Sequence, residues 1–241
     1  MSDRGPITTA SRRLALFDLD GTLLTGDTDV LWCAFLIDEG VLERAAFEAA
    51  NAVVAERYAR GEITPAEFCA FYAATLAGRG AADWAPLRQR FVAAVIAPRL
   101  GAEALALVEQ HRASGDRLVV TTATSRYLAE PIAERLGIAD LIASELEVAT
   151  GVFTGRNTGV LNMGEGKVAR LKGWLEAERL SEAALSAAIF YSDSINDLAL
   201  LSAVGEPVVV DPDPRLAAEA ARRAWPMLRL DRRLPGGAVE P

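Results

Sequence analysis

The sequence contains few of the residues that form cross-links or histidine- and cysteine-ligated metal sites. Its 241 residues include only two cysteines, Cys33 and Cys69, and one histidine, His111. Both cysteines lie in apolar stretches without metal-ligand spacing, so we expect buried thiols in a reducing compartment and no disulfide framework. His111 lies in a polar helical segment, where a surface position is expected. The chemistry of this protein is therefore expected from other side chains.

Long apolar runs and an excess of positive charge are also missing. No run approaches the roughly 18–20 apolar residues of a membrane-spanning helix, and the first residues, MSDRGPITTASRR, lack the apolar core of a signal peptide. Lys and Arg number 25 against 33 Asp and Glu, a net charge of −8. Nucleic acid requires a basic surface, so we expect no nucleic-acid partner. From the missing apolar runs we expect a cytoplasmic protein without membrane partners. The oligomeric state is left open.

A helical block occupies the region between residues 28 and 96. Ala, Leu, Glu and aromatic residues recur there at helical spacing, with breaks at Gly40, 61–65 and 78–82. Three breaks predict four helices and little strand. Within the second break, Thr64-Pro65-Ala66-Glu67 has the pattern of a capping box with proline at the first helical position, which predicts a helix start.

After residue 98 the pattern alternates between helix and strand. Helices are predicted at 102–113, 127–136, 167–178, 196–204 and 214–223, strands at 117–122, near 141, at 187–191 and at 207–210, and a hairpin at 147–155 with its turn at Thr150-Gly151. This alternation predicts an α/β protein with a doubly wound parallel sheet. The core is expected at 1–25 and 99–241, an inserted all-helical cap domain at 26–98, and a disordered tail at 231–241.

The first predicted strand ends in an acidic motif. Leu14–Phe17 is apolar and is followed directly by Asp18-Leu19-Asp20-Gly21-Thr22-Leu23. Ligands of open parallel sheets bind beyond the carboxyl ends of the strands, so Asp18 and Asp20 lie where a site is expected, and Gly21 lets the backbone turn. Taken alone, the motif also suits an acidic strand-to-helix loop without function.

Three further segments bring polar side chains to the same edge. Val119-Val120-Thr121-Thr122 ends in hydroxyls, Gly164-Glu165-Gly166-Lys167 places a lysine at a helix start, and Tyr191-Ser192-Asp193 ends in a carboxylate followed by Asn196 and Asp197. Each has an ordinary alternative, as a helix cap, a solvated lysine or surface acids. Their convergence on one sheet edge, where helix amides also attract phosphate, favours a shared phosphate site.

These motifs resemble the four signature motifs of the haloacid dehalogenase superfamily phosphatases. The resemblance runs from Asp18 to Asp197 and is closest to the branch that includes phosphoserine phosphatase and bacterial histidinol-phosphate phosphatases. It extends through Ala129–Ala133, Gly164–Lys167, Tyr191–Asp197 and Asp211–Arg215. It implies a Rossmann-like core with a helical cap between the first and second motifs, and a Mg²⁺-dependent phosphatase that acts on a small phosphomonoester.

The resemblance also assigns roles to the motif residues. Asp18 would attack phosphorus, since a carboxylate is ionised at neutral pH and needs no activating base, and would carry an aspartyl-phosphate. Asp20 would protonate the leaving alkoxide and later deprotonate the attacking water. Lys167 would offset the charge of the phosphate and of Asp18. The other implied roles are Mg²⁺ ligation by Asp18, the Asp20 backbone carbonyl and Asp193, orientation of metal-bound water by Asp197, and phosphate binding by Thr122, Ala123, Lys167 and Asn196.

The substrate is the least constrained feature. Phosphoserine phosphatases have an acid nine positions after the nucleophile that holds the substrate amino group, and Asp27 occupies that position here. They also have a cap arginine for the substrate carboxylate. Ungapped alignment places that arginine at about Ala70, inside the arginine-free stretch Phe68–Leu76. An unpaired buried carboxylate is unfavourable, so the sequence favours an aminated substrate with a ring and without a carboxylate.

L-Histidinol phosphate fits this description, with Phe68, Phe71 or Tyr72 as candidate ring contacts and L-phosphoserine as the alternative. Asp27 as a simple helix cap remains open at this point. More distant alternatives are a phosphotransferase or mutase, and a receiver-type signalling domain. The receiver is disfavoured because its phosphorylated aspartate ends the third strand, whereas Asp18 follows the first.

Overall fold

Residues 12–232 are described in the computed structural model, and within them seven strands form a single sheet. Its order is β4-β3-β2-β1-β5-β6-β7, and all neighbouring strands are parallel except β3 and β4. The strands are β1 Leu14–Phe17, β2 Arg117–Ser125, β3 Asp140–Ala149, β4 Val152–Thr158, β5 Ile189–Ser192, β6 Glu206–Val210 and β7 Met227–Leu228. The predicted α/β sheet is thus confirmed, with β1 at its centre.

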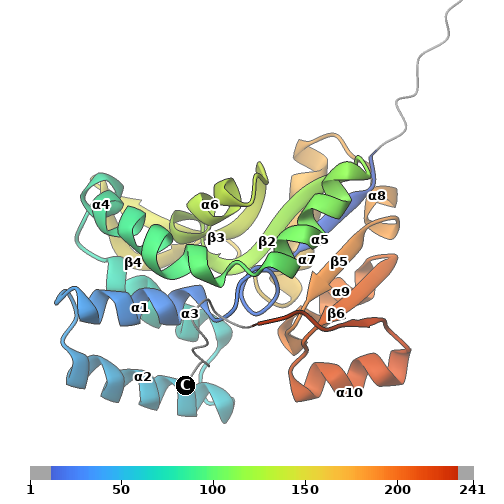
Figure 1. The fold of residues 1–241 in the computed structure, drawn as a ribbon. Coiled ribbons are helices and arrows are strands. Elements are labelled where there is room, and N and C mark those ends of the chain that lie inside the picture. Colours follow the sequence, from blue (N-terminus) through green and yellow to red (C-terminus); the bar gives the residue numbers. More distant parts are fainter. Residues whose placement is uncertain (1–11, 233–241) are drawn as a thin grey trace, which may run out of the picture.

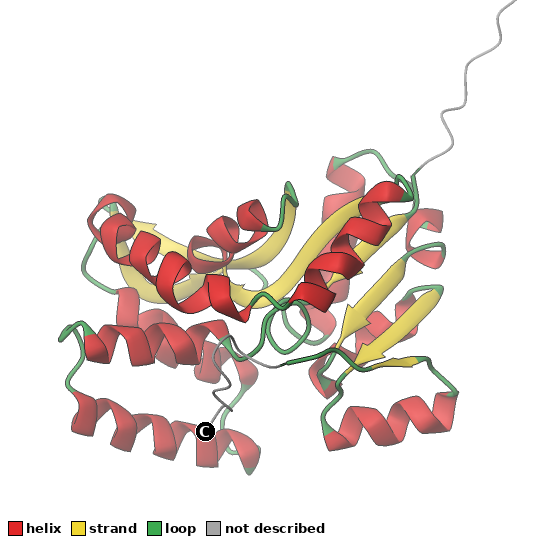
Figure 2. Cartoon of the chain, in the orientation of Figure 1, coloured by secondary structure: helices red, strands yellow, loops and turns green. Residues whose placement is uncertain are grey.

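Helices cover both faces of the sheet (Figure 2). Side chains of β1 alternate between them: Phe17 packs in one hydrophobic cluster with Val108 and Ile132, and Leu16 packs in another with Leu171 and Leu201. This alternation is the period of a strand buried on both faces. The core helices are α5 Ala102–Ala113, α6 Arg126–Arg135, α7 Glu165–Ala177, α8 Ala183–Ser186, α9 Leu198–Ala203 and α10 Pro214–Arg223, and the short 3-10 helix η4 is Ile195–Asp197.

The block between β1 and β2 is helical, as predicted, with α-helices at the four expected places. They are α1 Thr28–Asp38, α2 Arg44–Ala59, α3 Pro65–Ala73 and α4 Ala81–Phe91, with short helical turns η1 Ala74–Leu76, η2 Val92–Ile96 and η3 Ala97–Arg99. The predicted capping box is present: the Glu67 amide donates to Thr64 Oγ1 at 3.2 Å, and the Thr64 amide donates to Glu67 Oε2 at 2.8 Å. Figure 1 shows α1, α2 and α3 gathered at one end of the molecule.

Two strands are longer than the sequence predicts. β3 runs without a break from Asp140 to Ala149 and joins the short strand expected near 141 to the first arm of the hairpin. The hairpin turn lies where it was predicted, and both Thr150 (φ 50°) and Gly151 (φ 82°) are left-handed, as a type I′ turn requires. β2 continues through Ser125, because its threonines are β-branched and suit a strand.

Backbone hydrogen bonds join the helical block to the core. Before α4, the Gly78 amide donates to the Phe153 carbonyl of β4 at 2.9 Å, and the Phe153 amide donates back to the Arg79 carbonyl at 3.0 Å. The Tyr127 hydroxyl of α6 also donates to the Ala81 carbonyl at 3.0 Å. These contacts fix α4 against α6 and the β3–β4 hairpin.

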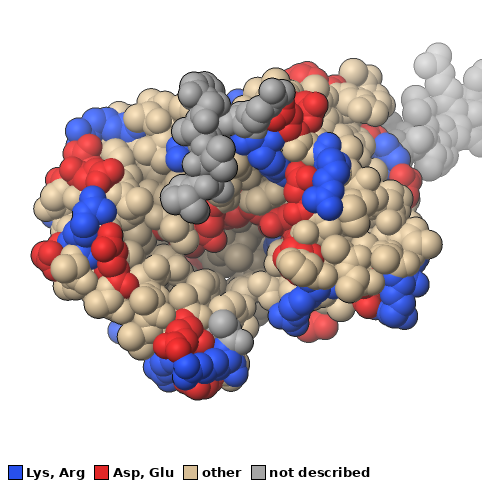
Figure 3. Space-filling model, turned by 60° about the horizontal axis from the view of Figure 1, so that its bottom comes forward, with Lys and Arg blue, Asp and Glu red and all other residues tan. Residues whose placement is uncertain are grey.

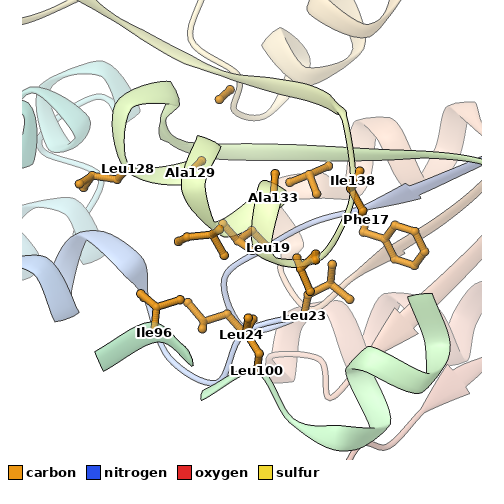
Figure 4. Close-up of a cluster of buried hydrophobic side chains, with 14 of the residues drawn as sticks. Phe17, Leu19, Leu23, Leu24, Ile96, Leu100, Leu128, Ala129, Ala133 and Ile138 are labelled. Atoms are coloured by element: carbon orange, nitrogen blue, oxygen red, sulfur yellow. The ribbon is translucent and has the colours of Figure 1, made fainter. Parts of the chain in front are cut away.

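The hydrophobic core is continuous across the two connections of the helical block. Leu24 before α1 and Leu100 after η3 lie in one buried cluster with Ile96, Leu19 and Leu128 (Figure 4). The division into a core and a cap at 26–98 stays a prediction. Packing alone does not separate α1 and α4 from the core, because both contribute side chains to this cluster, whereas α2 contributes none of its described side chains.

No single helix within residues 12–232 has the length and apolar composition to cross a membrane. The bent pair Ala81–Arg99 and Ala102–Ala113 has them jointly, and its two parts meet at 91°. Of the tail predicted to be disordered, residues 233–241 lie outside the described residues. At its start, Arg232 donates to the Gly21 carbonyl at 2.7 Å and to Asp211 Oδ2 at 2.9 Å.

Candidate active site

The loop after β1 places the two acids of the first motif. Asp18 follows Phe17 directly, and its amide donates to the Tyr191 carbonyl of β5 at 2.9 Å. The loop then turns at Gly21, whose φ of 72° is left-handed and where a Cβ would lie 2.1 Å from Asp193 Oδ2. Only glycine fits both conditions. The turn therefore brings the end of β1 against the end of β5.

Lys167, near the start of α7, is the cation of the site. Its Nζ donates to Asp18 Oδ1 and to Asp197 Oδ2, both at 2.6 Å, and its side chain is only 2% exposed. Asp197 Oδ2 also accepts a hydrogen bond from Ser192 Oγ at 2.7 Å. Three segments that the sequence analysis selected separately thus converge on one buried charge cluster.

The pKa values in this cluster follow from burial and from its mixture of charges. Burial raises the pKa of Asp18 well above its usual range, Lys167 opposes the shift, and Asp197 and Asp193 add to it. Burial alone would lower the pKa of Lys167, but the two carboxylates outweigh it and raise that pKa. A lysine held between two aspartates stays protonated, so it supplies a fixed positive charge beside Asp18.

Asp20 is held by hydroxyls from two other segments. Its Oδ1 accepts hydrogen bonds from the Thr28 amide at 2.8 Å and from the Thr28 hydroxyl, and its Oδ2 accepts one from Thr124 Oγ1 at 2.6 Å. The Thr122 hydroxyl lies 3.5 Å from Oδ2. Burial raises the pKa of Asp20, and the threonine hydrogen bonds oppose that shift. Asp20 is therefore a carboxyl in a fixed orientation with a raised pKa.

Asp193 stands at the end of β5 beside the first loop. Its Oδ1 accepts a hydrogen bond from Thr22 Oγ1 at 3.1 Å. Burial raises its pKa to about 6; Thr22 opposes the shift and Asp197 adds to it. Asp193 in turn raises the pKa of Asp18. Two carboxylates that repel each other in a buried place are a donor set that a divalent cation stabilises.

The predicted ligands Asp18 and Asp193, with the Asp20 carbonyl, suit Mg²⁺. This ion takes hard oxygen ligands and usually only one or two protein carboxylates. Within residues 12–232, no group of three or more His, Cys, Asp or Glu residues is arranged to hold a metal. Two carboxylates and one backbone carbonyl make a donor set that fits a cation held by few protein ligands.

All of the predicted site residues line one cavity of about 310 Å³. They are Asp18, Asp20, Asp27, Thr122, Ala123, Lys167, Asp193, Asn196 and Asp197. The cavity lies between the sheet edge and the helices α2 and α3, which contribute Tyr58, Phe68 and Tyr72. In Figure 3, acidic side chains are visible at the bottom of a hollow near the centre of the face.

Asp27 both caps a helix and lines the cavity, two roles that the sequence left as alternatives. Its side chain caps α1 by accepting a hydrogen bond from the Val30 amide at 2.9 Å. The same carboxylate also lines the cavity. Burial, with a smaller contribution from Asp20, raises its pKa to about 6. Capping and a place at the cavity wall are therefore compatible.

Several residues of the site were not predicted from the sequence. Thr28 and Thr124 hold Asp20, and Asp29, Tyr58 and Cys69 form part of the wall. Thr124 follows Thr122 at the strand period of two, a signal that could have found it. Of the expected ring contacts, Phe68 and Tyr72 do line the cavity, whereas Phe71 stacks on Phe47. Cys69 is only half-buried, unlike Cys33.

The surface position expected for His111 is wrong. The side chain is buried, with Nδ1 2.6 Å from Asp116 Oδ2 and Nε2 2.9 Å from the Tyr191 hydroxyl. Its ring meets the edge of Phe17 beneath the sheet. The polar appearance of its helix was misleading because Asp116, just after the helix, and Tyr191, from β5, satisfy the two ring nitrogens. His111 lies outside the cavity lining.

A family model for haloacid dehalogenase-like hydrolases matches residues 15–202. The chain belongs to this family. Among its relatives, a histidinol-phosphatase from Neisseria meningitidis is 35% identical over 218 residues, which cover 90% of this chain and 98% of the relative. A phosphoserine phosphatase from Mycobacterium tuberculosis is 30% identical over 228 residues, covering 88% and 68% of the two chains.

Solved structures agree with the assignment of the chain to this family. A protein of unknown function from Bordetella pertussis matches with a TM-score of 0.86 and 38% identity, over 91% of this chain and 99% of that one. A substrate-bound phosphoserine phosphatase matches with a TM-score of 0.65 and 18% identity, over 92% and 94% of the two chains, and this likeness concerns the fold. The family and these relatives together identify this protein as a phosphatase.

Proposed function

We propose that the protein hydrolyses its substrate in two steps through an aspartyl-phosphate on Asp18. In the first step a carboxylate oxygen of Asp18 bonds to phosphorus, and the bond from phosphorus to the substrate oxygen breaks. In the second step water attacks the same phosphorus and releases inorganic phosphate and free Asp18. The observation that carries the proposal is the buried Asp18–Lys167–Asp197 cluster at the centre of the sheet edge.

Asp20 is the residue that moves the protons. Its carboxyl protonates the departing alkoxide in the first step and takes a proton from water in the second. The raised pKa of this buried group supports the acid role, and the hydrogen bonds from Thr28 and Thr124 support a fixed orientation. Lys167 stabilises negative charge on the phosphoryl group and holds Asp18 in place.

Asp18, Asp193 and the Asp20 carbonyl would hold Mg²⁺, with Asp197 outside the direct ligands. When bound, the cation supplies positive charge that offsets the phosphate oxygens and the repelling carboxylates. Thr122, Ala123 and Asn196 would bind the phosphoryl oxygens. In support, all three line the cavity beside Asp18.

The substrate that the cavity supports best is L-histidinol phosphate. Tyr58, Phe68 and Tyr72 offer ring surfaces, and Asp27 offers an anion for an ammonium group. Among the described residues of the cavity wall, Lys167 is the sole Lys or Arg, and it is engaged by two aspartates. A carboxylate, as in L-phosphoserine, would therefore lack a cationic partner there. The identity of 35% with a histidinol-phosphatase also supports this choice.

L-Phosphoserine is the second candidate, supported by the relative from Mycobacterium tuberculosis. Phosphate release with Mg²⁺ from the two esters separates the candidates. We expect kcat/KM to be higher for L-histidinol phosphate, and Asp18→Asn to abolish release from both. A higher kcat/KM for L-phosphoserine would contradict the substrate assignment, and full activity in excess chelator would contradict the metal assignment.

A further inference from the structure

Beside the cavity lies a second, much smaller one whose lining does not include Asp18, Asp20 or Lys167, and we call it the distal recess. It holds about 10 Å³ and is lined by polar groups of Asp29, Ser125 and Asn157 and by Cys69 and Tyr72, together with Ala73, Leu76 and Ala123. Asp29, Cys69 and Tyr72 also line the main cavity, so the recess adjoins it. Its polar residues come from three elements, α1, the end of β2, and β4.

The polar groups of the recess lack partners among the described residues. Ser125 is 8% exposed, and its Oγ makes no hydrogen bond. The side-chain nitrogen of Asn157 is likewise buried without a partner. The Asp29 carboxylate has no hydrogen bond or ion pair, although Asp27 two residues earlier caps the helix. Buried polar groups are unfavourable unless they are paired, so two buried unpaired atoms beside an unpaired carboxylate point to a ligand that pairs them.

The chemistry of the recess selects the kind of ligand. Asp29 accepts hydrogen bonds and carries negative charge, the Asn157 nitrogen donates, and the Ser125 hydroxyl can do either. Tyr72 adds an aromatic wall. Burial raises the pKa of Asp29 well above its usual range, and the nearby carboxylates of Asp27 and Asp20 add to the shift. A ligand N–H that donates to Asp29 would offset this crowding of carboxylates.

We propose that Asp29, Ser125 and Asn157 form a subsite for the ring nitrogens of a nitrogen heterocycle, while Asp27 binds the substrate ammonium group. This inference rests on the proposed function, because it places the imidazole of L-histidinol phosphate at the recess. A ring N–H donates to Asp29, and the second, unprotonated ring nitrogen accepts a hydrogen bond from the Ser125 hydroxyl or from the Asn157 side-chain nitrogen. The ring itself lies in the main cavity beside Tyr72, since the recess admits only its edge. Asp29 is then a specificity residue for this class of substrate.

The test compares two substrates that differ in the ring nitrogens. L-Histidinol phosphate and L-phenylalaninol phosphate share the amino alcohol phosphate, but only the first has ring nitrogens. We expect the wild-type protein to prefer the first by at least about 50-fold in kcat/KM, well within the roughly 10⁴-fold that a site can reach when the wrong substrate leaves its buried polar groups unpaired. Asp29→Asn should reduce this ratio at least about tenfold, chiefly by raising KM for L-histidinol phosphate.

Two further variants keep the test decisive. Asp38→Asn removes a carboxylate from the far end of the same helix, where it is exposed and pairs with Arg44, and should leave the ratio unchanged. Ser125→Ala should lower the ratio less than Asp29→Asn does, and it serves if Asp29→Asn fails to fold. Across the variants, binding of L-histidinol, measured by calorimetry, should weaken as the ratio of the two kcat/KM values falls.

The possible failures are distinguishable. If the wild-type protein does not hydrolyse L-histidinol phosphate, the substrate assignment fails and this inference fails with it. If it hydrolyses L-histidinol phosphate but both recess variants keep the wild-type ratio, the recess inference is wrong and the substrate assignment stands. That result would mean that the recess holds only water.

Discussion

The two ends of the cavity are built in opposite ways. At the phosphoryl end, Asp18, Asp20 and Lys167 each have partners within hydrogen-bonding distance before any substrate is present. At the far end, Asp29 and Ser125 have none among the described residues. The chemistry is therefore preorganised, whereas recognition of the remainder of the substrate waits for the ligand.

This difference separates what the family shares from what the individual protein selects. Preorganised charges stabilise a transition state without reorganisation during the reaction, and the phosphoryl group is the same in every phosphomonoester. Unpaired polar groups have the opposite use: they penalise any ligand that does not satisfy them. Each of the following experiments disturbs one end of the cavity and leaves the other intact.

The largest effect is expected from Asp18→Asn. The amide is a poor nucleophile, so kcat should fall by at least about 10⁴-fold, equivalent to about 5.5 kcal/mol of barrier. Binding of L-histidinol, which lacks the phosphate, should be unchanged because the far end is untouched. Steady-state phosphate release and calorimetry measure the two quantities. Appreciable multiple turnover by the purified variant would refute Asp18 as the nucleophile.

The next effect concerns the buried ion pairs. Lys167→Met leaves Asp18 and Asp197 buried without their cation, so the free energy of unfolding should fall by about 3–5 kcal/mol. Lys172→Met is the matched control on the same helix, since Lys172 is 49% exposed and pairs with Glu182 at 3.2 Å. It should lose less than about 1 kcal/mol. Urea unfolding measures the free energy of unfolding of both variants. Equal losses would show that the buried ion pairs of Lys167 do not stabilise the fold more than an exposed pair does.

A smaller effect is expected from the turn that joins the two acid loops. Gly21→Ala combines a left-handed backbone with a Cβ only 2.1 Å from Asp193, which should cost about 2–4 kcal/mol of stability. Gly115→Ala has a similar φ of 80° and nothing within 4 Å, so it should cost only about 1 kcal/mol. Gly21→Ala should also raise the Mg²⁺ concentration for half-maximal activity. An unchanged Mg²⁺ concentration for half-maximal activity would contradict a role of Asp193 in the metal site.

The smallest predicted effect is a pH dependence of substrate binding. With a pKa of about 6, Asp27 is ionised at neutral pH and becomes protonated as the pH falls through 6. Protonation removes the anion that we propose for binding the ammonium group, so KM for L-histidinol phosphate should rise a few-fold below pH 6. The Asp27→Asn variant should have a higher KM than the wild-type protein at neutral pH, and its KM should lack this rise below pH 6. Because both proteins are compared on one substrate, the titration of the phosphate itself cancels. Parallel curves of KM against pH for the two proteins would contradict the role of Asp27.

The phosphoryl end could be predicted from the sequence because its residues are tied to local patterns. Asp18 follows an apolar run, Lys167 follows a Gly-rich turn, and Asp193 ends another strand. Parallel strands bring such ends to one edge whatever the details of packing. The capping box at Thr64 was equally local and equally predictable.

The far end and the buried histidine could not be predicted in this way. His111 pairs with Tyr191, 80 residues away, and the recess joins Asp29, Ser125 and Asn157 from three separate elements. No period or spacing in a single segment marks such contacts, because tertiary packing alone brings the residues together. Asp29 was missed for a further reason: at sequence level it reads as an ordinary acid in the first turn of a helix.

The central claim, covalent catalysis by Asp18, is tested most directly by trapping the phosphorylated protein. Asp20→Asn should still transfer a phosphoryl group from p-nitrophenyl phosphate, whose leaving group needs no proton, but should lose the base for the second step. Acid-quenched Asp20→Asn protein is digested, and its peptides are examined by mass spectrometry. We predict one phosphoryl group on the peptide that contains Asp18, and none in the double variant Asp18→Asn/Asp20→Asn. A burst of nitrophenolate with no phosphoryl group on the protein, or one on a different residue, would contradict the mechanism.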